Sequence, residues 1–475
     1  MIPVAGTVLT DAPVIWPVST LIYNLGLLYC FALMPRKSAS VIVFNVVAGS
    51  FFLVESAFFF SYYLQNTGFN DAFFYHLRPD LLHAGVSEHL PLLLFAIACL
   101  FGFLLFSSLS IVEGRFVNRQ RLSIALASLI FGLFISPPAK ALVDYVGNLS
   151  ADPPGNTAFD EFPELKNPEL RVDFTATKRP NIVMIYAESL EQRFFDESIF
   201  PGLMPNLKKL RKESVDFTNI AQGVGAGWTV AGMVASQCGY PLAESRGVSE
   251  NNLSLFDKFL PKSECLGDLL ASDGYHLTFI GGADERFAGK ADFLKSHGYA
   301  EVFGRGELEQ VLFDKSYLNP CGVFDDTLFD YAFNKFISLN RNNSPFLLTL
   351  LTIDTHHPNG YMSKSCEAYA YENNSMLHSV HCSDQLISSF IEKIRKSEYS
   401  DDTIIILLSD HLALRNVATP LLKTSKMPER LTFFINTPQG RKAKNINPGV
   451  HYDIAPTILD FIGYRVNGQI GFGSP

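Results

Sequence analysis

A threonine that follows a glycine-rich turn is the first residue of this chain whose type and position suggest chemistry. The segment from Gly223 to Gly239 reads GVGAGWTVAGMVASQCG, with three glycines at alternate positions before Thr229. Glycines allow a tight turn close to a ligand, and the small apolar residues that follow predict a buried helix. The start of a helix favours a phosphate or an alkoxide. Thr229 could therefore be a nucleophile, although a threonine that only caps a helix is far more common.

Three apolar runs end in residues with acidic or imidazole side chains. The runs at 181–187, 346–353 and 403–408 predict buried strands, and they are followed by Glu188, by Asp354-Thr-His356-His357 and by Ser409-Asp410-His411. Ligands gather at the carboxyl ends of strands in a parallel sheet. Each residue alone has an ordinary structural explanation. Their joint occurrence at strand ends favours a catalytic site.

A divalent metal ion would account for this set of residues. Glu188, Asp410, His411 and the Thr229 hydroxyl offer three oxygens and one nitrogen, which suit Mn²⁺, Mg²⁺ or Zn²⁺ and not a thiophilic ion. An unassisted threonine has too high a pKa to attack phosphorus. Coordination by a divalent cation would lower that pKa and neutralise phosphate charge. The pattern therefore predicts a metal-activated threonine.

Two further segments fit the handling of a phosphate group. A glycine-rich loop at 281–290 follows a predicted strand and offers Lys290, with Arg286 beside it, as a cation for a phosphate oxygen. His356 could donate a hydrogen bond to the same group or act as a general acid or base. Lys290 could instead be solvated, and we expect only one of His356 and His357 to face the site. His451 could serve a second metal, but we favour packing beside the site.

The elements that position these residues alternate between strands and helices. We predict strands at 181–187, 277–280, 346–353, 403–408 and 431–435, and helices at 205–213, 229–237, 266–272, 325–340, 383–396 and 454–462. Continuous apolar strands separated by helices predict a mostly parallel sheet that is covered on both faces.

The first third of the chain is strongly apolar. Four runs of about 20 residues or more are long enough to cross a membrane as helices, and they are Val14–Leu33, Val41–Leu64, Leu90–Val112 and Leu122–Ala141. Pro137-Pro138 interrupts the fourth run, which is the weakest of them. No cleavable signal peptide is evident. Glu55 lies inside the second run and could be structural or functional.

Basic residues in the short loops predict the orientation of these spans. Arg36 and Lys37 lie between the first two runs, and Arg115, Arg119 and Arg121 lie between the last two. Basic loops stay on the cytoplasmic side. We therefore predict a transmembrane domain at 1–142, a linker at 143–180 and an outer, periplasmic catalytic domain at 181–475 in a bacterial inner membrane.

Charge and cysteine content limit the function classes further. The chain has 47 acidic residues against 38 lysines and arginines, a net charge of −9 that argues against a nucleic-acid partner. Five of the seven cysteines fall in the predicted outer domain, where disulfides are permitted. Short separations favour the bridges Cys238–Cys265 and Cys366–Cys382 and leave Cys321 free. No CxxC motif is present, so a thiolate zinc site is not expected.

Several of these motifs together resemble a known family. They are Ile185-Tyr-Ala-Glu-Ser-Leu-Glu, Val230-Ala-Gly-Met-Val-Ala-Ser-Gln-Cys-Gly, Arg286-Phe-Ala-Gly-Lys, Asp354-Thr-His-His-Pro and Ser409-Asp-His-Leu-Ala. The chain resembles the sulfatase-related membrane transferases that include lipoteichoic acid synthase, and most of all the phosphoglycerol transferase I group. The resemblance implies an α-helical transmembrane bundle followed by an α/β alkaline-phosphatase-like domain.

The resemblance also implies an activity and roles for single residues. It implies transfer of phosphoglycerol from phosphatidylglycerol to a periplasmic glucan, with Mn²⁺ as the expected metal. The metal ligands implied are Glu188, Thr229, Asp410 and His411, and the headgroup contacts implied are His356 and Lys290. We interpret Trp228 as a wall of the headgroup pocket.

Three other functions stay open at this point. They are a phosphoethanolamine transferase, a metal-dependent phosphodiesterase or sulfatase-like hydrolase, and a non-catalytic membrane sensor. The Cys-x-Pro-x-Arg signature of sulfatases is absent.

Overall fold

A computed structural model describes most of the last 305 residues and little of the first third. The described residues are 171–174, 178–242, 260, 263–342 and 344–474, with short stretches at 49–50, 53–59, 61, 97, 101, 138, 140 and 142–143. The chain divides into two compact units, Met1–Pro153 and Pro154–Pro475. The four predicted spans lie almost entirely outside the described residues. Within the described residues, no helix is both long and apolar enough to cross a membrane.

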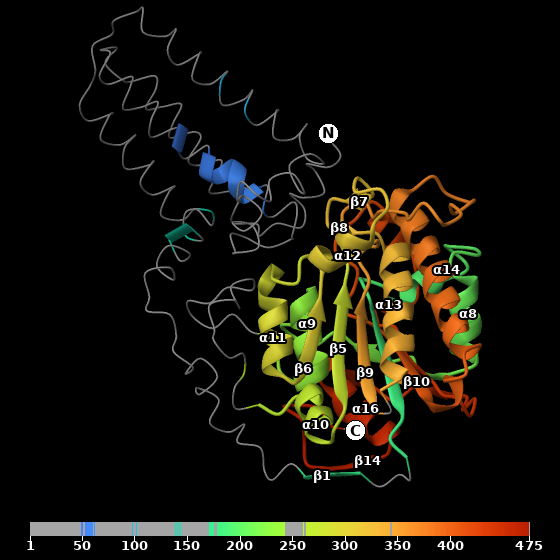
Figure 1. The fold of residues 1–475 in the computed structure, drawn as a ribbon. Coiled ribbons are helices and arrows are strands. Elements are labelled where there is room, and N and C mark those ends of the chain that lie inside the picture. The colour runs from blue at the N-terminus through green and yellow to red at the C-terminus, as the bar shows by residue number, and fades with distance from the viewer. Residues whose placement is uncertain are drawn as a thin grey trace, which may run out of the picture. The chain divides into compact units, whose positions relative to one another are not determined.

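The second unit is built around an eight-stranded sheet (Figure 1). Its strand order is β12-β3-β11-β10-β2-β9-β5-β6. The parallel centre consists of β10 (Thr403–Ser409), β2 (Asn181–Ala187), β9 (Phe346–Leu351), β5 (His276–Gly281) and β6 (Tyr299–Phe303). Beside it, β11 (Phe433–Asn436) is antiparallel to β10 and to β3 (Val215–Phe217), which pairs in parallel with β12 (Ala443–Asn445). The predicted mostly parallel sheet is therefore confirmed.

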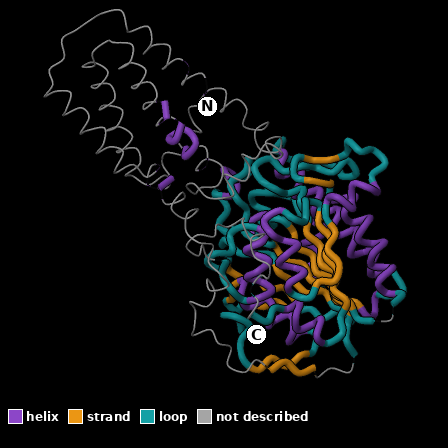
Figure 2. Tube along the Cα trace, turned by 60° about the vertical axis from the view of Figure 1, so that its left-hand side comes forward, coloured by secondary structure: helices purple, strands orange, loops and turns teal. Residues whose placement is uncertain are grey.

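Helices cover both faces of this sheet (Figure 2). One face carries α9 (Thr229–Cys238), α10 (Leu266–Ser272), α11 (Lys290–Ser296) and α16 (Ile454–Phe461), and the other carries α8 (Pro205–Lys212), α13 (Asp325–Asn340) and α14 (Ser375–Arg395). The other α-helices that the structure describes in this unit are α12 (Arg305–Val311) and α15 (Thr419–Leu422). Three two-stranded pairs complete the unit: β1 (Arg171–Phe174) with β14 (Tyr464–Asn467), β4 (Ile220–Ala221) with β13 (Gly449–Val450), and β7 (Leu318–Asn319) with β8 (Gly322–Val323).

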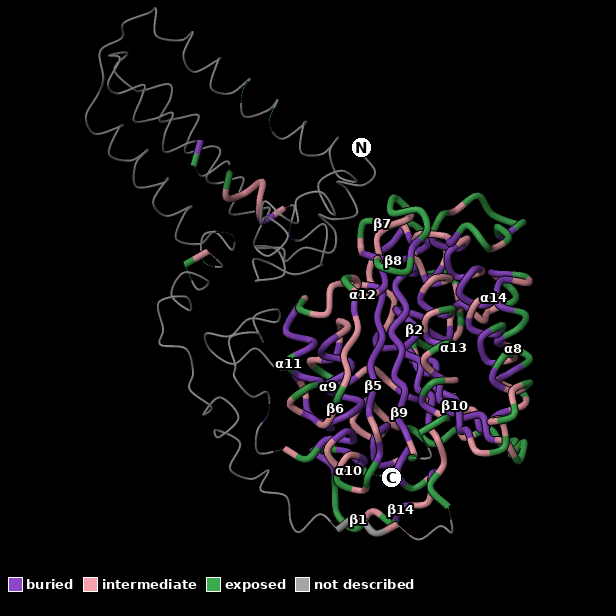
Figure 3. Tube along the Cα trace, viewed as in Figure 1, coloured by how far each residue is buried: buried purple, intermediate pink, exposed green. Residues whose placement is uncertain are grey.

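The central strands are buried on both faces, as Figure 3 shows in purple. Along β2, Ile182, Met184 and Tyr186 point into the core under α9, whereas Val183 and Ile185 point into the core under α13 and α14. This alternation follows from the two-residue period of a strand. It explains why β2 is apolar at almost every position instead of at every second one.

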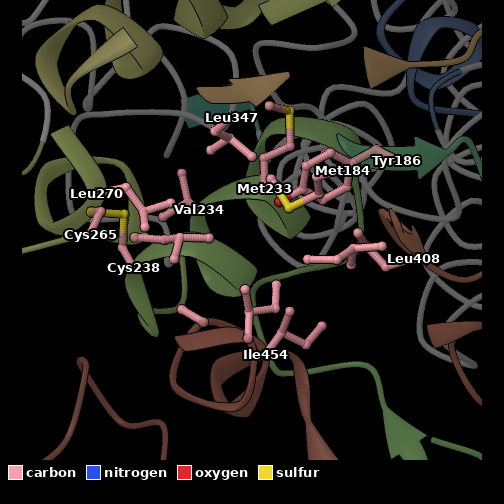
Figure 4. Packing of buried hydrophobic residues seen from close by; sticks show 14 of the residues in the cluster. Met184, Tyr186, Met233, Val234, Cys238, Cys265, Leu270, Leu347, Leu408 and Ile454 are labelled. Carbon is pink, nitrogen blue, oxygen red and sulfur yellow. A yellow bond between two sulfur atoms is a disulfide. The ribbon is translucent and has the colours of Figure 1, made fainter. Parts of the chain in front are cut away.

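Two disulfides join segments of the second unit. Cys238 at the end of α9 is bonded to Cys265 just before α10, beside Leu270 and Val234 in the core (Figure 4). The second bond joins Cys366 to Cys382 in α14. Both predicted bridges are confirmed, and Cys321 is free among the described cysteines.

Most predicted elements occur within one or two residues of the predicted ends, but α14 does not. It begins at Ser375, eight residues before the predicted start at 383. The Asn374 side chain accepts a hydrogen bond from the Leu377 N–H at 3.2 Å, so an ordinary N-cap sets the start of this helix.

Candidate active site

Four of the predicted site residues meet at the carboxyl end of the sheet. Glu188 follows β2, Asp410 and His411 follow β10, and Thr229 is the first residue of α9. Ligand atoms of Glu188, Asp410 and His411 lie within 4.8 Å of one another, and Thr229 Oγ1 donates a hydrogen bond to Glu188 Oε2 at 3.2 Å. Thr229 is half-buried while the other three are buried. The hydroxyl is therefore the accessible member of a buried polar cluster.

Ser189 connects the two carboxylates, although the sequence pattern gave it no role. Its N–H donates to Asp410 Oδ1 at 2.8 Å and its hydroxyl donates to Glu188 Oε1 at 3.0 Å. These bonds occur with Ser189 at φ 56°, in the left-handed region that costs a non-glycine residue about 1–3 kcal/mol. The surrounding contacts therefore hold a strained turn that aligns both carboxylates. A serine directly after Glu188 was visible in the sequence, but its backbone angle was not.

The Asp410 carbonyl is in contact with α9 and with His451. A Cβ added to Gly232 would lie 1.9 Å from Asp410 O, so the absence of a side chain there lets α9 approach the end of β10. His451 Nε2 donates to the same carbonyl at 2.9 Å, and His451 Nδ1 accepts the Gly223 N–H at 3.1 Å. Burial lowers the pKa of His451 to about 3, so the ring is neutral. Both ring nitrogens have backbone partners, in agreement with packing beside the site.

The buried charges of the cluster depend on one another. Burial raises the pKa of Asp410 to about 7, and the neighbouring Glu188 carboxylate adds to this effect. Against the effect of burial, Asp410 and Glu188 raise the pKa of His411 to about 9. Burial also opposes ionisation of Glu188, but His411 holds the pKa of Glu188 below its usual range. The cluster thus stabilises positive charge between two carboxylates.

The donor set fits a divalent cation. His411 Nδ1 donates to the Leu412 carbonyl at 2.7 Å, which orients Nε2 toward Glu188 Oε1 at 3.4 Å and Asp410 Oδ2 at 3.3 Å. Asp410 Oδ2 is buried and has no hydrogen-bond donor in the described part of the chain. Carboxylate oxygens and an imidazole nitrogen are ordinary ligands for Mn²⁺, Mg²⁺ and Zn²⁺. A second group, Cys238, Cys265 and His297, is excluded as a metal site because its sulfurs form a disulfide.

His356 lies at the end of β9 with its orientation set by its neighbours. Its Nδ1 donates to the His357 carbonyl at 2.7 Å and lies 3.6 Å from Cys321 Sγ. Burial opposes protonation, but Cys321 and the Glu188 carboxylate raise the pKa of His356 well above its usual value. The ring can therefore carry a proton toward a phosphate oxygen or a leaving group.

The remaining predicted site residues lie in different surroundings. Lys290 begins α11 and is only 2% exposed, and burial lowers its pKa to about 8 against the opposing effect of Asp284, Glu285 and Glu188. The Arg286 side chain is 81% exposed and bonds to Asp284 at 2.7 and 3.0 Å. Trp228 is half-buried just before α9, against the core on that face of the sheet. The structure thus buries Lys290 and leaves Arg286 at the surface.

Comparison with known proteins identifies the family. The family model described as "Sulfatase" matches residues 180–464. The chain belongs to the sulfatase family. A second model, described as "Phosphoglycerol transferase I, N-terminal domain", matches residues 13–148. The predicted family resemblance is therefore confirmed.

Curated relatives in this family extend beyond the length of the chain. Phosphoglycerol transferase I of Xanthomonas axonopodis pv. citri (strain 306) is 38% identical over 445 residues, which are 89% of this chain and 60% of the relative. Phosphoglycerol transferase I of Escherichia coli O6:K15:H31 (strain 536 / UPEC) is 37% identical over 432 residues, which are 88% of this chain and 54% of the relative. The chain therefore spans between half and two thirds of the relatives it matches.

Solved structures support the fold. An alkaline phosphatase superfamily protein from Vibrio parahaemolyticus matches with a TM-score of 0.53 and 25% identity, over 65% of this chain and 72% of its own. The lipoteichoic acid synthase LtaP of Listeria monocytogenes matches with a TM-score of 0.53 and 20% identity, over 66% of this chain and 80% of its own. The integral membrane lipooligosaccharide phosphoethanolamine transferase EptA of Neisseria meningitidis matches with a TM-score of 0.53 and 15% identity, over 89% of this chain and 84% of its own. The second unit thus has an alkaline-phosphatase-like fold.

Proposed function

We propose that this protein transfers phosphoglycerol from phosphatidylglycerol to a glucan in the periplasm, with Thr229 as the nucleophile. The observation that carries the proposal is the half-buried Thr229 hydroxyl, which lies 3.2 Å from Glu188 at the start of a helix and beside Asp410 and His411. The relatives named phosphoglycerol transferase I support the choice of the transferred group. The four apolar runs of the first third support an enzyme held in the inner membrane, with its catalytic domain in the periplasm.

The reaction takes two displacements at phosphorus. Thr229 Oγ1 forms a bond to the phosphorus of phosphatidylglycerol while the bond to the diacylglycerol oxygen breaks, and the threonine proton is transferred to that oxygen. An acceptor hydroxyl oxygen then forms a bond to the phosphorus of the glycerophospho-threonine while the bond from phosphorus to Thr229 Oγ1 breaks, and the acceptor's proton is transferred to Oγ1. Diacylglycerol leaves in the first step and the glucan gains phosphoglycerol in the second.

The residues around Thr229 have different roles in these two steps. Glu188, Asp410 and His411, with the Thr229 hydroxyl, would hold a divalent cation, for which we favour Mn²⁺, and this ion would lower the pKa of the hydroxyl and neutralise phosphate charge. His356 can give a proton to the departing diacylglycerol oxygen or take one from the acceptor. Lys290 supplies a buried positive charge for the phosphate, and Trp228 forms a wall beside the headgroup.

Product analysis tests this proposal. The full-length protein is placed in vesicles containing phosphatidylglycerol labelled in its headgroup, with and without a glucan, and in the presence of Mn²⁺. We expect diacylglycerol release and label on the glucan, both abolished when a chelator removes the metal. Release of free glycerol phosphate at the same rate with and without glucan would instead identify a hydrolase. Transfer from phosphatidylethanolamine but not from phosphatidylglycerol would identify a phosphoethanolamine transferase.

The buried Lys290 predicts a pH dependence of donor binding. Its pKa of about 8 means that the ammonium is charged below that pH and neutral above it, whereas an exposed lysine would stay charged to about 10.5. We therefore expect the KM for phosphatidylglycerol to rise as the pH passes 8. Initial rates at pH 6.5 to 9.5 measure this effect.

Two substitutions separate the effect of Lys290 from other titrations. Lys290→Met should give a high KM at every pH, and Lys290→Arg should remove the rise because a guanidinium stays protonated throughout this range. Lys295→Met, at an exposed position of the same helix, serves as the matched control. If the rise above pH 8 persisted in Lys290→Arg, another group would be responsible for it.

A further inference from the structure

A cavity lies outside the residues assigned to catalysis. It has a volume of about 500 Å³ and lies between the end of α12, the loop that leads to β7, and α13. Binding pockets for small ligands are commonly 300–1,000 Å³. The residues that matter for its chemistry are Phe313, Tyr317, Asp330, Tyr331, Asn334 and Lys364.

One wall of this cavity is held rigidly. The Tyr317 ring stacks on Phe324 with centroids 4.5 Å apart. Its hydroxyl donates to Asp326 Oδ2 at 2.8 Å and accepts the Lys364 N–H at 2.7 Å. A wall fixed in this way before binding loses little conformational freedom when a ligand arrives.

The other side of the cavity presents an aromatic ring to solvent. The Phe313 side chain is fully exposed, at 106%, and the neighbouring Val311 is 56% exposed. Large apolar side chains grouped at the surface mark interaction sites. The phenyl ring offers an apolar face next to the hydrogen-bonding side chains of Asn334 and Asp330, of which Asp330 also pairs with Lys393 at 3.0 Å.

The charges of the lining decide between ligand classes. Two carboxylates, Asp314 and Asp330, and one ammonium, Lys364, line the cavity. Because Asp330 is paired with Lys393, the charges around the cavity balance, and a phosphate or a phospholipid headgroup would find no excess of positive charge there. A neutral sugar ring fits better, because its C–H face can stack on Phe313 while its hydroxyls bond to the amide and carboxylate groups.

The segment from Tyr317 to Cys321 connects this cavity to the candidate active site. Tyr317 precedes Cys321 by four residues, which span at most about 14 Å, and Cys321 Sγ lies 3.6 Å from His356 Nδ1. The β7–β8 hairpin, which contains Cys321, lies near the end of β5 (Figure 1). The Val323 N–H donates to the carbonyl of Gly282, the residue that follows β5, at 2.9 Å. A short oligosaccharide could therefore lie in the cavity and reach His356.

We propose that this cavity binds a sugar unit of the acceptor and so directs an acceptor hydroxyl toward the phosphorylated threonine. The proposal rests on the proposed function, since it identifies where that reaction holds its second substrate. It assigns Phe313 and Asn334 to acceptor binding and gives them no part in the attack on the lipid.

Kinetics of the full-length enzyme in phosphatidylglycerol vesicles test the proposal. We expect Phe313→Ala and Asn334→Ala each to raise the KM for a β-glucan oligosaccharide roughly fivefold to tenfold, the effect of losing one stacking or hydrogen-bonding contact. The first-turnover release of diacylglycerol without glucan should be unchanged. Matched controls are Tyr371→Ala, an exposed aromatic residue outside the cavity, and Ser338→Ala, an exposed residue of α13. An unchanged acceptor KM in both cavity variants would overturn the proposal.

Direct binding separates this proposal from the proposed function. Calorimetry of the full-length Thr229→Ala protein in detergent, titrated with the same oligosaccharide and separately with glycerol phosphate, measures binding without turnover. Loss of oligosaccharide binding in Phe313→Ala supports the sugar site even if the wild type proves unable to transfer phosphoglycerol. Equal oligosaccharide binding with and without the Phe313 ring, or a cavity that binds only glycerol phosphate, would overturn it.

Discussion

Replacing Thr229 by alanine should stop diacylglycerol release from phosphatidylglycerol while the protein stays folded. The Thr229 hydroxyl is the half-buried oxygen beside Glu188, and the proposed reaction has no other nucleophile. Loss of a catalytic nucleophile lowers kcat by roughly three orders of magnitude or more. The measurement is diacylglycerol production by the full-length variant in vesicles, together with its thermal unfolding.

Two comparisons make this result specific. Thr229→Ser keeps a hydroxyl and should retain measurable turnover, and mass spectrometry of acid-quenched enzyme should find glycerophosphate on residue 229 in the wild type and in the serine variant only. Thr424→Ala is the matched control, because Thr424 is exposed and its hydroxyl donates to the Leu421 carbonyl at the end of α15. Turnover near the wild-type rate in Thr229→Ala would show that another group attacks the phosphorus.

The central fold was predictable because its strands are buried on both faces. A strand such as β2 or β10 is apolar at nearly every position, and this pattern stands out in the sequence. The edge strand β12 and its neighbour β3 have only three residues each, and two of the three residues of β12 are exposed. Such short segments have no pattern that distinguishes them from loops, so they were not predicted.

The polar cluster was predictable because strand ends in a parallel sheet share one edge. Glu188 and Asp410 follow strands that pair directly with each other, and the sequence places both of them at that edge. The contacts that align them depend on tertiary structure. The left-handed turn at Ser189 and the bonds from His451 to Gly223 and Asp410 join segments that are up to 228 residues apart.

The proposed acceptor cavity could not be predicted for the same reason. Its aromatic residues lie in the α12–β7 loop and on α13, and Lys364 comes from the segment that follows His356. No sequence spacing connects them. The disulfides were easier to predict, because each bridge closes a short stretch, with separations of 27 and 16 residues.

Gly232 should also be sensitive to substitution, although it bears no functional group. In Gly232→Ala the new Cβ would lie 1.9 Å from Asp410 O, a backbone atom that is also held by His451 Nε2. Because neither partner can yield easily, α9 must shift and carry Thr229 away from Glu188. A misplacement of about 1 Å can lower a rate by 10²-fold, so we expect kcat to fall by about that factor.

Stability should change less than activity in this variant. Overpacking costs about 1–3 kcal/mol, while alanine favours a helix over glycine by about 1 kcal/mol, so the net loss of unfolding free energy should be about 0–2 kcal/mol. Gly306→Ala is the matched control, because Gly306 lies in α12 with no atom within 4 Å of an added Cβ. Full activity in Gly232→Ala would mean that α9 can move without displacing the Thr229 hydroxyl. The close contact between α9 and Asp410 would then be a packing feature of the fold, and the position of the nucleophile would have to depend on the glycine-rich turn before it.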